Sequence, residues 1–206
     1  MPIQVCYPTA DGTVQRTGSQ GFYTGYGETT DYVAGPPYWS FLEETPADDS
    51  GTWVAWAVQN DANIGCALSF VIPTFEGPSN SIIEYVKVYF RGHPGQSGGA
   101  FVTPSGTGNN FNLGVYYKGI EYTEAKTFLG TTGWTTFSAT FTTNQSGNPW
   151  TTADFPLQPM FSYGRYWFTS DKSNTINDNA QNVTSQIYLE ISYTIPSYSS
   201  SLLLYI

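Results

Sequence analysis

The sequence is poor in charge, and especially poor in positive charge. Charged residues make up 11% of its 206 residues, whereas soluble domains average about 25%. Seven Lys and Arg stand against 16 Asp and Glu, which gives a net charge of −9. Because nucleic acids and anionic membranes are both bound through basic surfaces, the composition excludes both kinds of partner.

Long apolar runs and paired cysteine motifs are also missing. No run approaches the roughly 18 apolar residues of a membrane span, and "MPIQVCYPTADG" has neither the basic nor the apolar region of a signal peptide. We therefore expect a soluble protein that is made in a cytoplasm. The two cysteines, Cys6 and Cys66, form no CxxC or zinc pattern. The apolar run around Cys66 favours a free buried thiol there, while the spacing leaves a disulfide open.

The patterns of common catalytic sites are absent as well, so we do not expect an enzyme. The one histidine, His93, lies in "RGHPGQSGG", which its composition predicts to be an exposed loop. The chain has no GxSxG nucleophile elbow, and it has no HExxH motif or other cluster of zinc ligands. A glycosidase with paired carboxylates is an alternative, in which Glu43 or Glu44 would act with Glu84 or Glu190.

The sequence does contain a series of short apolar runs separated by Gly and Pro, which is typical of an all-β protein. In "SIIEYVKVYF" (81–90), one face holds Ile82, Glu84, Val86, Val88 and Phe90, and we expect it to face a core. In "VTSQIYLEISYTI" (183–195), alternate residues are apolar, which predicts a strand. Further strands are expected in "TWVAWAV", "CALSFVI", "NFNLGVYYKG", "WTTFSATFTT" and "FSYGRYWFTS".

These strands predict an antiparallel β-sandwich or jelly roll over residues 39–195. Residues 1–38 are rich in Gly, Thr and Tyr with weak alternation, and we expect an extended N-terminal arm or an appended hairpin. Residues 196–206 end in five apolar residues, and we expect this tail to dock on the domain or on a neighbour. Aromatic residues make up 17% of the chain and suit a core, a sugar-binding surface or a protein interface.

The order of four segments resembles that of tailed-bacteriophage virion structural proteins. The first is "YWSFLEETPADDSGTW", which has a tryptophan and an acidic E-x-x-P-x-D turn. The others are "VKVYFRG" (86–92), "NPWTTADF" (148–155) and "VTSQIYLEISY" (183–193). The resemblance covers roughly residues 38–195 and implies a lectin-like (concanavalin-like) jelly roll in a virion.

Such virion proteins include capsid decoration (cement) proteins and tail proteins, so the resemblance implies no catalytic residues. We also expect no metal, because the Asp, Ser, Asn and Gly residues of the acidic segments are ordinary turn formers, and no cofactor. The expected function is a capsid decoration protein that binds across capsid subunits and stabilises the head. Its partners would be the major capsid protein or other virion proteins, and it would form a homo-oligomer, with a trimer favoured. A carbohydrate-binding module of a tail or fibre is the alternative.

The resemblance also assigns roles to individual residues. The arm and the tail would supply the interface residues Tyr23, Tyr26, Tyr32, Leu202, Leu203, Leu204, Tyr205 and Ile206. The four carboxylates within residues 43–49 would form a turn between the first two strands rather than a calcium site. In that turn Asp48 and Asp49 would accept hydrogen bonds from backbone amides, and Pro46 would fix the backbone angle.

Overall fold

The regular secondary structure in the described part of the chain consists almost entirely of β-strands. The computed structural model describes residues 1–16, 22–26, 33–34, 39–42, 52–58, 66–96, 109–128, 134–163 and 180–196. Two short 3-10 helices lie in these ranges, Trp39–Phe41 (η1) and Thr152–Asp154 (η2). The strands are Ile3–Cys6 (β1), Ala10–Arg16 (β2), Phe22–Tyr26 (β3), Val33–Ala34 (β4), Thr52–Val58 (β5), Cys66–Val71 (β6), Ile82–Gln96 (β7), Asn109–Tyr117 (β8), Ile120–Phe128 (β9), Thr135–Phe141 (β10), Gln158–Tyr163 (β11) and Ala180–Thr194 (β12). None of the helices in this part of the chain is long and apolar enough to cross a membrane.

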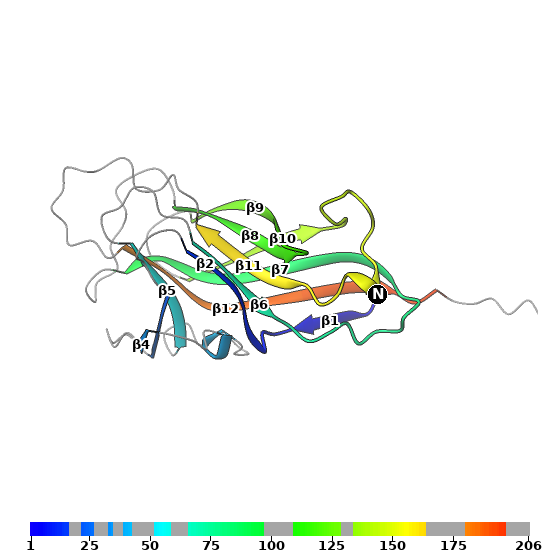
Figure 1. Cartoon of the computed structure of the whole chain (residues 1–206), viewed down its shortest axis with the longest axis horizontal. Helices are drawn as coiled ribbons and strands as arrows, with labels where there is room; N and C mark the ends of the chain where they lie inside the picture. Colours follow the sequence, from blue (N-terminus) through cyan, green and yellow to red (C-terminus); the bar gives the residue numbers. More distant parts are fainter. Residues whose placement is uncertain are drawn as a thin grey trace, which may run out of the picture.

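The strands form two antiparallel sheets, which confirms the predicted β-sandwich. The larger sheet, sheet A, has the order β10-β7-β12-β5-β3-β4. β1 also pairs with β12, on the same side as β5 but further along the strand, at residues 189–192 rather than 180–184. The smaller sheet, sheet B, has the order β2-β6-β11-β8-β9. Figure 1 shows the long strands β7 and β12 running together along the molecule, with β1 beside β12 on the side away from β7.

Alternation along the long strands builds the core. Val86, Val88 and Phe90 of β7 are completely buried, and so are Ile187, Leu189 and Ile191 of β12. Phe90 meets Phe111 of sheet B with ring centroids 4.8 Å apart, so the two sheets pack directly on each other. Each fully buried side chain of this size contributes about 1.5–3 kcal/mol.

The predicted face assignment is wrong at the start of β7. We expected Ile82 to face the core and Ile83 to face solvent, but Ile83 is 3% exposed and Ile82 is 55% exposed. Tyr85 pairs with Ser192 and Ile83 pairs with Tyr193, so Glu84 is an extra residue on β7. A β-bulge of this kind shifts the alternation by one residue, which exchanges the two faces of the strand.

The predicted loop at His93 is also wrong, because β7 continues to Gln96. His93 pairs with Val183, and Gln96 pairs with Gln181. The pairing register shifts between these two pairs, at Pro94 and Gly95. An irregularity of this kind accommodates a proline, which has no N–H to donate. Pairing with the long strand β12 thus keeps this segment in β7, although its composition favours a loop.

The N-terminal segment differs from the extended arm that we expected. Within residues 1–38, β1 pairs with β12 in sheet A and β2 pairs with β6 in sheet B. β3 pairs with β5 and with β4. The described part of this segment is therefore built into both sheets. The expected tail lies outside the described residues from residue 197 onward.

Candidate functional site

Most residues predicted for an interface or a turn lie outside the described part of the chain. This holds for Glu43, Glu44, Pro46, Asp48, Asp49, Tyr32, Leu202, Leu203, Leu204, Tyr205 and Ile206. Tyr23 and Tyr26 belong to β3, where the backbone alone is described. Their predicted roles stay predictions. Among the described residues, no group of three or more His, Cys, Asp or Glu side chains could hold a metal ion.

The outer face of sheet A carries a row of aromatic side chains that we call the tyrosine stack, made of Tyr7, Tyr188 and Tyr89. Tyr188 and Tyr89 are cross-strand partners, and their rings stack at 4.6 Å with an interplanar angle of 13°. Tyr7 follows β1 and packs against Tyr188 at 5.4 Å. Because β12 lies between β1 and β7, the two neighbours approach the Tyr188 ring from opposite sides.

The rings of the stack are covered by one another and by a lysine side chain. Tyr7 and Tyr89 cover the two faces of Tyr188, and the Lys87 ammonium lies 4.5 Å from the centroid of the Tyr89 ring. The ring quadrupole of Tyr89 attracts this cation. A sugar ring would need a free aromatic face, so Tyr188, which has a ring on each side, is closed to sugar stacking. Burial, followed by the neighbouring Tyr89, raises the pKa of Tyr188 to about 12, which keeps its hydroxyl neutral.

Glu190, which lies beside the stack, accepts hydrogen bonds from two tyrosine hydroxyls. The Tyr85 hydroxyl donates to Glu190 Oε1 at 2.8 Å, and the Tyr89 hydroxyl donates to Glu190 Oε2 at 3.4 Å. The hydrogen bond to Glu190 raises the pKa of Tyr85. The other carboxylate considered for a glycosidase pair, Glu84, accepts from the Thr194 hydroxyl at 3.0 Å. Both carboxylates thus serve as hydrogen-bond acceptors for neutral hydroxyls.

Next to the stack, β1 exposes a second feature that we call the β1 stripe, made of Met1, Ile3 and Val5. Their exposed fractions are 81%, 53% and 45%. The pattern is inverted, because the polar Gln4 side chain points inward, where its Nε2 donates to Thr74 O at 3.2 Å and its Oε1 accepts from Glu76 N at 2.9 Å. Three apolar side chains are thus exposed side by side at β1, which makes the stripe a candidate interaction surface.

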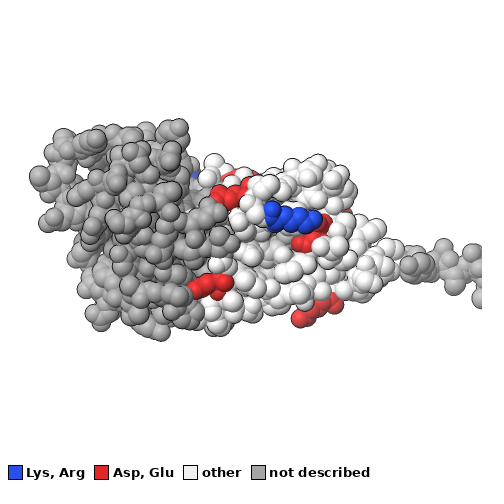
Figure 2. All heavy atoms as spheres, viewed as in Figure 1, with Lys and Arg blue, Asp and Glu red and all other residues white. Residues whose placement is uncertain are grey.

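Ile82 extends the apolar surface at the Met1 end of the stripe. It is 55% exposed and pairs with Thr194, on the strand that separates β7 from β1. The charged side chains Lys87, Glu190 and Glu84 at this face are engaged with neighbouring side chains. In the view of Figure 2, the described surface shows isolated acidic and basic side chains rather than a continuous patch of either sign.

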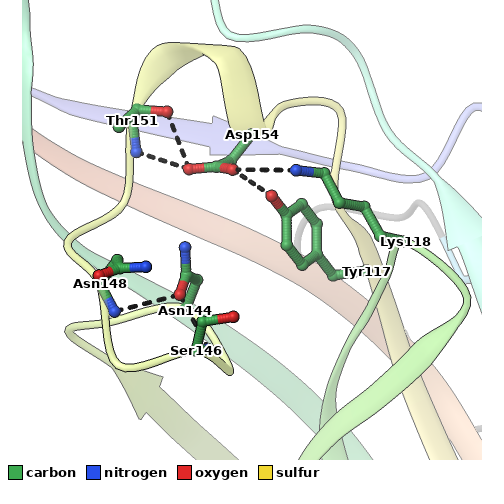
Figure 3. A network of polar contacts seen from close by, with 7 residues as sticks. All are labelled: Tyr117, Lys118, Asn144, Ser146, Asn148, Thr151 and Asp154. Atoms are coloured by element: carbon green, nitrogen blue, oxygen red, sulfur yellow. Dashed lines mark hydrogen bonds and ion pairs between the residues drawn. The ribbon is translucent and has the colours of Figure 1, made fainter.

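A separate network of polar contacts, around Asp154 and Asn144, stabilises the end of the sandwich (Figure 3). Asp154 accepts hydrogen bonds from the Tyr117 hydroxyl, from Thr151 N at 2.8 Å and from Thr151 Oγ1 at 2.9 Å. Lys118 Nζ lies 3.9 Å from Asp154 Oδ1. Asn144 Oδ1 accepts from the backbone amides of Ser146 and Asn148 in the same region. These polar groups are engaged with the chain itself, so we assign the network a structural role.

Sequence reasoning missed the tyrosine stack and the β1 stripe. A signal was present, because "MPIQVCY" has apolar side chains at every odd position. The ordinary interpretation of such alternation buries that face, which is the opposite of what β1 does. The pairing of Tyr7, Tyr188 and Tyr89 depends on strand order, which alternation does not encode.

Comparisons with known proteins assign no family. No family model and no curated protein matches the chain. Among solved structures, it is similar to the N-terminal CBM22-1-CBM22-2 tandem domain from Paenibacillus barcinonensis Xyn10C, with a TM-score of 0.42 and 11% identity over 88% of this chain and 46% of that chain. It is also similar to the CBM22-2 xylan-binding domain from the same protein, with a TM-score of 0.35 and 11% identity over 91% of this chain and 98% of that chain. The chain spans less than half of the tandem domain, and at these TM-scores neither likeness bears on function.

Proposed function

We propose that this protein is a non-catalytic structural protein of a tailed-phage particle, in the role of a capsid decoration protein. The resemblance of residues 38–195 supports the virion. The observation that carries the binding role is the outer face of sheet A, where the β1 stripe and the tyrosine stack lie side by side. The partner is a neighbouring protein of the particle, which covers this face.

The physical character of the face suits a protein partner. Tyrosine is enriched at protein interfaces, because its ring gives a large contact area and has few rotatable bonds. Tyr188 and Tyr89 are already stacked, so little side-chain entropy is lost when a partner covers them. The exposed side chains of Ile3 and Val5 supply apolar area, which contributes about 25 cal/mol per Å² when it is buried.

A carbohydrate-binding module of a tail or fibre is the second candidate, and one observation favours it. Among the described residues no aromatic ring stacks on Tyr85, whose hydroxyl binds Glu190. A ring with a free face beside a carboxylate is a combination that sugars use, because the carboxylate accepts hydrogen bonds from sugar hydroxyls. In this role Tyr85 would act rather than the closed stack.

Mass spectrometry of purified particles tests the first proposal by counting this chain against the major capsid protein. A copy number comparable with that of the capsid protein supports head decoration. Ile3→Asp should reduce incorporation, whereas Ile120→Asp, at an equally exposed isoleucine on the β8–β9 hairpin, should not. Absence of the chain from particles would overturn the proposal. The second candidate requires binding on a glycan array that Tyr85→Ala abolishes.

A further inference from the structure

Strand β1 has one free edge. Within the described ranges it pairs with β12 alone, and Figure 1 places it at the margin of the sheet. Tyr193 N donates to Pro2 O at 3.2 Å, so the backbone groups of Pro2 face β12. Because these groups alternate in direction along an antiparallel strand, Gln4 and Cys6 also face β12. The N–H and C=O groups of Ile3 and Val5 therefore point away from the sheet.

This edge lacks most of the features that protect edge strands. Such strands usually carry a lysine or another charge, a bulge, or a covering segment. β1 reads Ile-Gln-Val-Cys, has no charged residue and pairs without a register shift. Its short length is its main protection, and Gln4 holds it in place against Thr74 and Glu76. The edge is thus a rigid template that offers four backbone groups beside two exposed apolar side chains.

The chain itself contains a segment that fits this template. Residues 202–206 read Leu-Leu-Leu-Tyr-Ile, which is uncharged and about as long as β1. In an extended conformation, Leu202, Leu204 and Ile206 share one face. These side chains can lie beside Ile3 and Val5 on the outer face of sheet A, while the backbone bonds to the free edge. Strand addition of this kind draws its affinity from main-chain hydrogen bonds and its specificity from alternate side chains.

Strand direction distinguishes a second copy from the same chain. β12 runs antiparallel to β1 and ends at Thr194, beside the Met1 end of β1. A segment that turned directly back from β12 along the free edge would start at that end, so it would run parallel to β1; to run antiparallel, the same chain would first have to pass residues 195–201 along the whole of β1. The antiparallel arrangement is the more stable of the two per residue. A segment that arrives from another molecule can adopt it.

We propose that residues 202–206 of a second copy add as an antiparallel strand to the free edge of β1. This inference rests on the proposed function, because it names a second copy of the chain as one partner at the outer face of sheet A. A contact between one region of each molecule and a different region of the next is heterologous, so it generates a ring when the rotation closes. The expected trimer is one such ring.

The experiment compares the full chain with a chain that stops at residue 201. Sedimentation across a concentration series should show an oligomer for the full chain and a monomer for the shortened chain. A labelled peptide of residues 197–206 should bind the shortened chain in an anisotropy assay. Ile3→Lys combined with Val5→Lys should weaken this binding about tenfold or more, because a charge then meets an apolar strand. Ile120→Lys is the matched control and should leave binding unchanged.

A peptide with a modified backbone distinguishes strand addition from nonspecific hydrophobic binding. A peptide with N-methyl groups at alternate amides keeps its apolar side chains but loses the hydrogen bonds to one edge, so it should not bind. Equal binding of both peptides would overturn the inference. So would a full chain that stays monomeric, even if the peptide binds the shortened chain, because the segment would then occupy its own edge.

The outcomes also separate this inference from the proposed function. A chain that is abundant in particles, yet monomeric and indifferent to the peptide, leaves the decoration role standing and overturns the strand exchange. A chain that oligomerises through residues 202–206 but is absent from particles supports the strand exchange and overturns the decoration role.

Discussion

Replacing Asp154 by asparagine should destabilise the fold by about 2–3 kcal/mol at neutral pH. Asp154 accepts hydrogen bonds from Tyr117 and twice from Thr151, and it lies near the Lys118 ammonium. A hydrogen bond to a charged acceptor contributes about 1.5–3 kcal/mol. An asparagine side chain places an NH2 group where one carboxylate oxygen was, so the bond to that oxygen is lost or reversed, and the remaining bonds lose their charged acceptor.

The effect depends on pH with a definite sign. Burial raises the pKa of Asp154, but the hydrogen bonds from Tyr117 and Thr151, together with Lys118, outweigh it and hold the pKa below its usual value of 3.8. A carboxyl group with a lowered pKa stabilises the fold above its unfolded pKa, and this contribution is lost as the pH falls through the folded pKa. Asp154→Asn should therefore cost its full amount at pH 7 and clearly less at about pH 3.

Urea unfolding followed by tryptophan fluorescence at both pH values measures this difference. Lys118→Ala is the control, because Lys118 is 70% exposed and 3.9 Å from the carboxylate, and exposed ion pairs of this kind contribute little to stability. A double-mutant cycle with Tyr117→Phe should give a coupling of about 1 kcal/mol or more. A loss of unfolding free energy below about 0.5 kcal/mol at pH 7, or an equal loss at both pH values, would refute the conclusion that the Asp154 carboxylate stabilises this region.

Three further predictions concern the core, a thiol and a turn. Phe90→Ala should cost about 3–5 kcal/mol in urea unfolding, because Phe90 is fully buried against Phe111; a cost near that of a surface change would contradict the assigned core. Burial raises the pKa of Cys6 to about 11, so in a Cys66→Ser background its thiol should resist Ellman's reagent at about pH 8 until urea is added, and rapid labelling of the native protein would argue against this. Lys118 and Gly119 form the β8–β9 turn with φ values of 49° and 86°. Since asparagine tolerates positive φ better than lysine, Lys118→Asn should raise the unfolding free energy by about 0.5 kcal/mol, and a clear loss would show that the side chain of Lys118 matters more than its backbone.

Much of the fold could be predicted from local alternation. β5 spans Thr52–Val58, the same residues as the predicted "TWVAWAV", and β12 contains the predicted alternation of Ile187, Leu189 and Ile191. Periodicity works in β12 because Ile187, Leu189 and Ile191 lie on the side of the strand that faces the core. It fails at Glu84, where one extra residue exchanges the two faces. It fails again at His93, where pairing with a long neighbour overrides a loop-like composition.

The candidate site was much less predictable. Tyr7, Tyr89 and Tyr188 are far apart in the sequence, and they meet because β12 lies between β1 and β7. Strand order is a property of the whole chain, so no single segment reveals that these rings stack. In the β1 stripe the inversion follows from Gln4, whose amide finds two backbone partners beneath the strand. A sequence pattern cannot show where such partners lie.

The rigidity of the outer face bears directly on what it can bind. Gln4 fixes β1 to the segment at Thr74 and Glu76, and the Tyr188 ring is held between Tyr7 and Tyr89. A partner that covers this face has few groups to order, so more of the favourable free energy of burial is retained as affinity. A surface that used free aromatic faces for sugars would need the opposite arrangement, with rings held apart by polar neighbours. The closed stack and the uncharged free edge therefore favour a protein strand over a sugar as the occupant of this face.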